Sequence, residues 1–314
     1  MSDRAIVVTG SLNMDFVVQV ERLPAPGETA RGENFQTIPG GKGANQACAA
    51  ARLARGNPVL MIGRVGYDAF ADHLRASLAA AGADTSRIHG CRRAATGVAL
   101  IWVDRTGQNS IVIAPGANAE LAPADLETEK QSFVSAACAL FQLETPLETV
   151  AAGLRLARSG GALSILDPAP AQPLDAGLLA HVDLLTPNET EACLLAGREP
   201  RRIPLGEAPA LAEELRRRGP RAVVLKLGDQ GCYYAGPEGS CYAPAFRVEA
   251  IDATAAGDTF NGALAVALAE GRAVPEALRF ANAAAALSVT RLGAQASIPP
   301  REEVEQFLAA RPQS

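Results

Sequence analysis

The chain has 314 residues, which is enough for one large α/β domain or two small ones. Hydrophobic residues make up 48% and charged residues 20%, as in ordinary globular proteins, and no apolar run approaches the ~18 residues of a membrane span. The net charge of −5 and the 4% aromatic content argue against a nucleic-acid partner, and without a signal-peptide pattern after Met1 we expect a cytoplasmic protein.

Cysteine and histidine are not expected to carry the chemistry of this chain. The six cysteines and three histidines are scattered, with no C-x-x-C pair. This spacing favours reduced, packed thiols over a zinc site or a Cys–His nucleophile. The remaining candidates are carboxylates, backbone N–H groups and a bound metal–nucleotide.

Residues 5–9 form an apolar, β-branched run that predicts a buried parallel strand ending at Gly10. No G-x-G-x-x-G follows, so a dinucleotide-binding interpretation is weak. Asn13 and Asp15 alternate and would point the same way from an extended chain, where they suit the hydroxyl groups of a polar ligand. An Asx-turn pair is the alternative, and these residues alone favour it.

Two strand pairs are predicted to leave the main sheet. Residues 16–20 and 29–38 flank a Pro/Gly turn, and residues 96–103 and 110–114 flank a hairpin turn at residues 104–107. Together these segments suggest a small flap or lid.

A glycine-rich loop at residues 39–46 precedes an alanine-rich helix predicted over residues 44–53. It is not a Walker A loop, because Gly43 stands where Ser or Thr should follow the lysine. The glycines allow close backbone approach to a small ligand, with Lys42 and Asn45 directed toward it. A tight strand-to-helix turn is the alternative.

Strands at residues 58–65, 139–143, 163–167, 184–185 and 222–227 alternate with helical patterns. This alternation predicts a parallel sheet covered on both faces, within one domain. Glu144 directly follows one of these strands. Asn188 and Glu191 form a capping box that is also suited to ordering water around Mg²⁺. Residues 226–231 form a glycine-bracketed turn suited to backbone contacts with a nucleotide.

The stretch 252–263 is the strongest functional signal in the chain. It follows a segment of strand-like content at residues 246–251 and leads into a helical pattern over residues 263–270. Small residues at 255–257 allow successive backbone N–H groups to bind an anion at the helix N-terminus. Asp258, in the first turn beside that anion, is suited to take a proton from an attacking hydroxyl. Simple helix capping by Asp258 is the alternative.

Five motifs in this order resemble those of the ribokinase (pfkB) family of ATP-dependent sugar and nucleoside kinases. They are Gly10-Ser11-x-Asn13-x-Asp15, residues 40–46, Leu143-Glu144, residues 186–191 and residues 255–260. The resemblance covers about residues 5–308. It implies a Rossmann-like three-layer α/β/α sandwich with a mainly parallel sheet, as a single domain over residues 1–314. The inserted β lid would comprise segments at about 13–38 and 96–114.

The resemblance also implies individual roles. Asp258 would be the general base on the O5 hydroxyl of D-ribose, and the backbone N–H groups of Ala255, Ala256 and Gly257 would form an anion hole for the γ-phosphoryl group of ATP. Asp258 would also help to hold the sugar. The other sugar-binding residues would be Asn13, Asp15, Gly41, Lys42, Asn45 and Glu144. The nucleotide would be bound by Asn188, Lys226, Gly228, Asp229, Gly231, Gly257 and Asn282.

Two cations are implied by the resemblance. Mg²⁺ would accompany ATP near Asn188 and Glu191, through water. K⁺ or another monovalent cation would bind beside the anion hole, largely through backbone oxygens of Asp252, Thr254, Ser288, Arg291, Gly293 and Ser297. Departures from the usual pattern are Met14 and Phe16, which bear on sugar preference, and Asp167 before Pro168.

The expected activity is ATP-dependent phosphorylation of D-ribose to ribose 5-phosphate. A related kinase for 2-deoxyribose, another sugar or a nucleoside is an alternative, and a non-catalytic sugar-binding regulator is a further one. The acidic and amide-rich set favours a polyhydroxylated pentose over an apolar base, and the intact setting of Asp258 favours an enzyme. An exposed lid face, together with the family resemblance, implies a homodimer through the lid.

Overall fold

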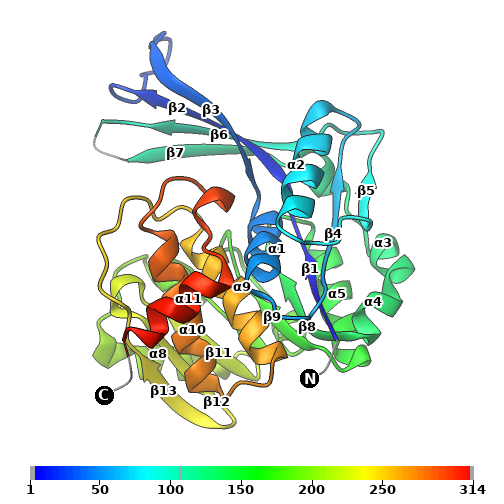
Figure 1. Cartoon of the computed structure of the whole chain (residues 1–314), viewed down its shortest axis with the longest axis vertical. Helices are drawn as coiled ribbons and strands as arrows, with labels where there is room; N and C mark the ends of the chain where they lie inside the picture. Colours follow the sequence, from blue (N-terminus) through cyan, green and yellow to red (C-terminus); the bar gives the residue numbers. More distant parts are fainter. Residues whose placement is uncertain (1–3, 106–107, 312–314) are drawn as a thin grey trace.

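The structure of the chain, a computed structural model, describes residues 4–105 and 108–311. Within them a nine-stranded central sheet is formed by β1 (Ala5–Thr9), β4 (Val59–Val65), β5 (Ile88–Gly90), β8 (Ala136–Phe141), β9 (Leu163–Leu166), β10 (Leu184–Leu185), β11 (Ala222–Lys226), β12 (Cys232–Gly236) and β13 (Gly239–Ala243). The order across the sheet is β13-β12-β11-β10-β9-β8-β1-β4-β5 (Figure 1). Neighbours from β11 to β5 are parallel, whereas β12 and β13 pair antiparallel at one edge.

Helices cover both faces of this sheet, which confirms the predicted α/β/α sandwich (Figure 1). One face packs against α1 (Lys42–Leu53), α2 (Ala69–Ala80), α9 (Ala256–Ala269), α10 (Val274–Ser288) and α11 (Arg301–Ala309). The other packs against α3 (Pro123–Thr128), α4 (Lys130–Val134), α5 (Leu147–Gly160), α6 (Ala176–Leu179), α7 (Glu189–Leu195) and α8 (Ala208–Arg216). In β1, Ile6 and Val8 enter the first core and Val7 the second, because successive strand residues face opposite sides.

A second, four-stranded sheet projects beyond the sandwich (Figure 1). It consists of β2 (Asn13–Val20), β3 (Gly32–Gly40), β6 (Gly97–Val103) and β7 (Asn109–Ala114), in the order β3-β2-β6-β7. Strands β2 and β6 are parallel and the outer pairs antiparallel. Part of the predicted hairpin turn, residues 106–107, lies outside the described residues.

The prediction of strand-like structure over residues 246–251 was wrong. This segment forms no strand, and its end is held instead by the backbone N–H groups of Ile251 and Asp252, which donate to the Val289 carbonyl. Strand β13 is the outermost strand at that edge of the sheet, and residues 246–251 do not pair with it. Helix α9 begins at Ala256, so Asp258 lies in its first turn as predicted, and the helical pattern that starts at residue 263 is the continuation of this helix.

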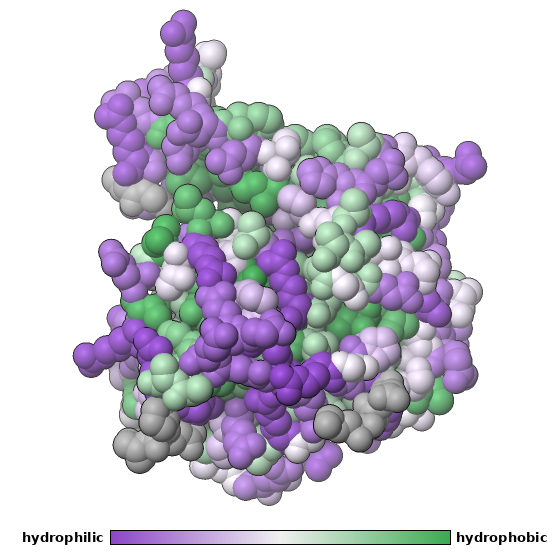
Figure 2. All heavy atoms as spheres, in the orientation of Figure 1, coloured by the Kyte–Doolittle hydropathy of each residue, from purple (hydrophilic) through white to green (hydrophobic). Residues whose placement is uncertain are grey.

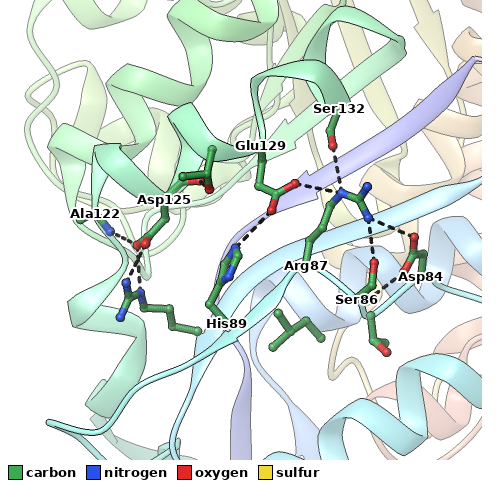
Figure 3. Close-up of polar contacts among 12 residues, drawn as sticks. Asp84, Ser86, Arg87, His89, Ala122, Asp125, Glu129 and Ser132 are labelled. Atoms are coloured by element: carbon green, nitrogen blue, oxygen red, sulfur yellow. Dashed lines mark hydrogen bonds and ion pairs between the residues drawn. The ribbon is translucent and has the colours of Figure 1, made fainter.

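A polar cluster closes the opposite edge of the sheet at β5 (Figure 3). Arg87 Nε lies 2.9 Å from a carboxylate oxygen of Glu129, and His89 Nε2 lies 3.5 Å from the other. Arg64 on β4 binds Asp125 on α3 through two contacts of 2.9 and 2.6 Å. These ion pairs anchor the three-residue edge strand to the α3–α4 segment, which protects the edge from pairing with another chain.

No helix among residues 4–105 and 108–311 combines the length and apolar character that a membrane crossing requires.

Helices α1 and α9 approach unusually closely, because small residues line their contact. A Cβ atom on Gly262 would lie 2.6 Å from the Ala49 Cβ and 2.8 Å from the Gln46 carbonyl oxygen. This approach sets Asn45 and Gln46 of α1 directly against Asp258 of α9.

Replacing Gly262 with Ala is expected to destabilise the fold by about 1–3 kcal/mol, because the added methyl group meets backbone atoms that cannot yield. In a helix without this contact, the same change would stabilise by about 1 kcal/mol. Thermal unfolding of Gly262→Ala measures the effect. Gly206→Ala, where the methyl group meets no atom within 4 Å, is the matched control. Equal unfolding temperatures for the two variants would contradict the packing argument.

Candidate active site

The N-terminus of α9 forms one wall of a cavity of about 460 Å³. Ala255 stands at the N-cap in the left-handed region, with φ 58° and ψ 13°, a conformation that is strained for a residue with a Cβ atom. It turns the chain sharply into the helix, so that Ala255, Ala256 and Gly257 line the cavity. The Ala256 N–H donates to the Ala253 carbonyl at 3.2 Å. Other N–H groups of a first helical turn have no partner within the helix, and together with the helix dipole they favour an anion at this position.

Asp258 follows in the first turn and is buried, with only 6% of its surface exposed. Its carboxylate accepts hydrogen bonds from the Asn45 side-chain amide at 3.1 Å and from the Gln46 amide at 3.0 Å. Burial raises its pKa from 3.8 to about 6, against the opposing charge of Lys42 and with the like charge of Asp167 adding to the rise. Asp258 is therefore ionised at neutral pH and basic enough to accept a proton.

The predicted sugar-side residues gather around the starts of β2 and α1 and the loop after β8. Asn13 and Asp15 lie on the same face of β2, and the Asn13 side chain accepts a bond of 2.8 Å from the Asn118 amide. Glu144 accepts hydrogen bonds from the Ser11 hydroxyl and, at 3.1 Å, from the Lys42 backbone N–H, whose chain turns into α1 at Gly41. These bonds fix the position of the Glu144 carboxylate.

Three carboxylates and one ammonium share this region. Burial, with repulsion from Glu144 and Asp258, raises the pKa of Asp15 to about 7. Burial alone would lower the pKa of Lys42, but Asp258 and the neighbouring carboxylates raise it above its ordinary value, so it stays charged. The negative charge therefore exceeds the positive charge on the sugar side, which suits the donation of hydrogen bonds by ligand hydroxyl groups.

The predicted nucleotide residues divide into two groups. Asn188, Lys226, Gly228 and Gly257 line the cavity. Asn188 caps α7. As the capping box predicts, the Glu191 carboxylate accepts hydrogen bonds of 2.7 Å from the backbone nitrogen and from the side-chain nitrogen of Asn188. Burial raises the pKa of Glu191, with Lys226 opposing the rise.

The other three predicted nucleotide residues do not line this cavity. Asp229 is exposed and pairs with Arg202, at a depression next to the cavity. Asn282 is buried and donates at 3.0 and 3.1 Å to the carbonyls of Ala243 and Pro244. A Cβ atom on Gly231 would meet the Ala243 carbonyl oxygen at 2.2 Å. Asn282 thus holds the loop after β13 by hydrogen bonds, and Gly231 lies directly against that loop.

The two segments predicted to bind a monovalent cation do meet in space. The Asp252 carboxylate accepts from the Thr254 N–H at 2.8 Å, the Thr254 hydroxyl at 2.6 Å and the Gly293 N–H at 2.8 Å. The hydroxyls of Ser288 and Ser297 donate to backbone carbonyls within their own segments, and Arg291 pairs with Glu303. In this predicted set, the Thr254, Ser288 and Ser297 hydroxyls thus bond within their own segments, and the Arg291 side chain is occupied by Glu303.

Sequence analysis missed two residues at the centre of the site. Gln46 donates to Asp258 and also to Asp167 at 3.0 Å, and its own carbonyl accepts from Gln142 at 2.7 Å. Asp167 lines the cavity and accepts from Lys226 Nζ at 2.9 Å. Asp167 follows the end of β9, just as Glu144 follows a predicted strand. A carboxylate directly after a parallel strand was therefore a signal in the sequence that could have identified Asp167.

A buried carboxylate of raised pKa beside an anion-binding helix N-terminus, with lysines on either side, defines a phosphoryl-transfer site on an α/β/α fold. Comparison with known proteins agrees. Residues 3–301 match the model of the pfkB family carbohydrate kinases. The chain belongs to this family.

Curated and structural relatives span nearly the whole chain. It is 42% identical to a ribokinase of Haemophilus influenzae, covering 97% of this chain and 98% of that protein. A ribokinase structure from Thermotoga maritima is 40% identical, with a TM-score of 0.88 over 98% of this chain and 99% of that one. The structure of Arabidopsis thaliana ribokinase complexed with ribose and ATP is 33% identical, with a TM-score of 0.90 over 97% and 98% of the two chains.

Proposed function

We propose that this chain transfers the γ-phosphoryl group of ATP to the O5 hydroxyl of D-ribose, forming ribose 5-phosphate. The observation that carries this proposal is the buried Asp258 carboxylate, held by Asn45 and Gln46 in the first turn of α9, beside the N–H groups of the anion-binding turn. The near-full-length similarity to ribokinases supports ribose as the acceptor.

In this mechanism Asp258 takes the proton of the O5 hydroxyl as oxygen attacks the γ-phosphorus. The backbone N–H groups of Ala255, Ala256 and Gly257 stabilise the charge that develops on the phosphoryl oxygens. Asn13, Asp15, Asn45, Lys42 and Glu144, with the Gly41 turn, hold the sugar hydroxyls so that O5 lies in line. Asn188, Lys226 and Gly228 contact the nucleotide from the cavity wall. Asp229 would act from the adjoining depression, and Gly231 and Asn282 through the loop after β13.

Mg²⁺ bound to ATP neutralises phosphate charge in this reaction. Both Glu191 oxygens accept hydrogen bonds from Asn188, and the described residues contain no cluster of three or more acidic, His or Cys side chains arranged to bind a metal. Asn188 and Glu191 would therefore contact the ion through water.

A monovalent cation such as K⁺ fits between the segments that Asp252 joins. Its carboxylate is the only acidic group in the predicted set of Asp252, Thr254, Ser288, Arg291, Gly293 and Ser297. The locally bonded Thr254, Ser288 and Ser297 hydroxyls leave backbone oxygens as the other ligands. The cation would order the turn that leads into Ala255, and so the anion hole.

The four-stranded sheet acts in this proposal as a lid within a single domain. Its strand register places Asp15, Val17, Ile101 and Ile111 on one face, with Gln36 of β3 opposite Val17. One end of this face therefore carries Asp15, a predicted sugar-binding residue, and apolar side chains lie beyond it at Ile101 and Ile111. Ile111 and Ile113 are 50% and 40% exposed. Apolar side chains gather on this sheet behind its polar tip (Figure 2).

We expect this apolar lid face to join two copies in a homodimer. Replacing Ile111 with Lys is expected to shift the chain from dimer to monomer, because the face can then be covered only by burying an unpaired charge. Light scattering at micromolar concentration measures the change. Val134→Lys on α4, where the side chain is 47% exposed, is the matched control. A monomeric unmodified chain would contradict the proposal.

One lesser proposal accompanies the activity. We place the protein in the cytoplasm, because all six cysteines lie in described segments and carry free thiols, as a reducing compartment favours.

The decisive experiment measures ADP release with ATP, Mg²⁺ and D-ribose, 2-deoxyribose, fructose or adenosine, each with and without K⁺. Turnover greatest with ribose and raised by K⁺ supports the proposal. Turnover greatest with another acceptor keeps the mechanism and changes the substrate. Sugar binding without turnover on any acceptor would favour a regulator.

A further inference from the structure

We propose that Asp167 is a positioning residue for phosphoryl transfer, which holds the Lys226 ammonium beside the anion-binding turn and sets it relative to the base Asp258. This inference rests on the proposed function and assigns a role to a carboxylate that the mechanism above does not use. The residues concerned come from four elements: the end of β9, the end of β11, α1 and α9.

Asp167 uses both oxygens of its carboxylate. Oδ1 accepts from Lys226 Nζ at 2.9 Å, and Oδ2 accepts from Gln46 Nε2 at 3.0 Å. The residue is only 3% exposed, and the Lys226 side chain only 12% exposed. The carboxylate is therefore fixed at two points and largely shielded from water.

Gln46 joins Asp167 to the catalytic base. Its side-chain nitrogen also donates to Asp258 Oδ1 at 3.0 Å, while its carbonyl oxygen accepts from Gln142 at 2.7 Å. The two carboxylates settle which end of the Gln46 amide faces them, since an amide nitrogen can donate to both and an amide oxygen cannot. Asp167 and Asp258 are thus held at a set separation through one side chain.

Lys226 directs its ammonium toward the anion-binding turn. Nζ lies 3.5 Å from the position that a Cβ atom would occupy on Gly257, and both residues line the cavity. An ammonium has three donors, and within the described part of the chain Asp167 takes one of them. The other donors can reach the oxygens of a phosphoryl group bound at the turn.

A structural role alone does not explain this arrangement. Buried ion pairs contribute little to stability, because desolvation offsets their attraction. The like charge of Asp167 also raises the pKa of Asp258, so Asp167 by itself works against ionisation of the base. Both observations are explained if Asp167 serves to place the Lys226 ammonium where negative charge develops on the transferring phosphoryl group.

Other charged groups around Asp258 must be held constant in any test. Lys42 at the start of α1 and Asp15 on β2 interact with the charge of Asp258, whereas Glu144 after β8 and Glu191 on α7 act on the charge of Lys42. Substitution of Asp167 or Lys226 leaves all four in place.

The test compares Asp167→Asn, Lys226→Gln and the double variant. We expect each single variant to lose about 10- to 100-fold in kcat at nearly unchanged KM for ribose, as when a transition-state contact is misplaced. The double variant should lose little more than either single one, because both changes remove the same contact. In Asp167→Asn the acid limb of the kcat profile should move to lower pH, since Asp258 loses a neighbouring negative charge.

Asp125→Asn is the matched control, because it breaks the ion pair to Arg64 at the far edge of the sheet (Figure 3). It should lower the unfolding temperature and leave kcat and its acid limb unchanged. A kcat of Asp167→Asn within twofold of the unmodified chain with an unmoved acid limb would overturn the inference, as would additive losses in the double variant.

Failure of the proposed function is distinguishable from failure of this inference. If the unmodified chain phosphorylates no acceptor, the proposed function fails, and calorimetry then tests the Lys226 position directly. Lys226→Gln should weaken ATP binding more than ADP binding, because only ATP carries the phosphoryl group at the turn. Equal weakening of both nucleotides would reject the placement of the ammonium.

Discussion

Replacing Asp258 with Asn is expected to lower kcat by about 10²- to 10⁴-fold, the range that a positioned general base contributes. Asn keeps the shape of the side chain and its place in the first turn of α9 but cannot accept the proton. KM for ribose and ATP should change little, since the substitution removes an interaction needed in the transition state. ADP release under saturating substrates measures the loss.

The pH profile adds a second readout for the same residue. The base acts when ionised, so kcat of the unmodified chain at saturating ribose should fall as pH drops through about 6, the raised pKa of Asp258. Asp72→Asn, an exposed acidic residue in the first turn of α2, is the control and should retain full activity. An Asp258→Asn variant with more than a tenth of normal kcat would show that another group takes the proton.

Replacing Asp15 with Asn is expected to weaken ribose binding and stabilise the fold at the same time. A hydrogen bond to a charged group contributes about 1.5–3 kcal/mol, so KM for ribose should rise by roughly 10- to 150-fold. Stability moves in the opposite direction, because Asp15 lies among carboxylates without a described partner for its charge and has its pKa raised from 3.8 to about 7. Binding and folding thus make conflicting demands on this residue.

The sign of the stability effect follows from proton binding. A carboxyl group whose pKa is higher in the folded state binds its proton more tightly there, so above pH 7 its ionised form destabilises the fold. The whole pKa shift of Asp15 corresponds to a destabilisation of the fold on the order of 4 kcal/mol. Partial exposure of the side chain to solvent reduces this free energy to about 2 kcal/mol.

Thermal unfolding without sugar tests this second prediction. Asp15→Asn should unfold at a higher temperature than the unmodified chain at pH 8, and the difference should shrink as pH falls from 7 toward 4. A variant that is less stable at pH 8 would show that the Asp15 carboxylate is favourably paired in the free protein.

Local signals in the sequence determined much of the framework. The strand of residues 5–9, the alternation that follows residue 120 and the Asn188–Glu191 capping box all appear as expected, because strand periodicity and helix capping act over a few residues. The same holds for the short turn of small residues before Asp258 and for the helix that begins there.

Only the tertiary structure decided how these parts combine. Gln46 and Asp258 are 212 positions apart, and they meet because Gly262 lets α1 and α9 pack closely. The role of Asp167, the exclusion of Asp229 from the cavity and the absence of a strand at residues 246–251 likewise depend on which segments become neighbours. A hydrogen bond between distant residues is specified by packing, and no signal local to either residue reports it.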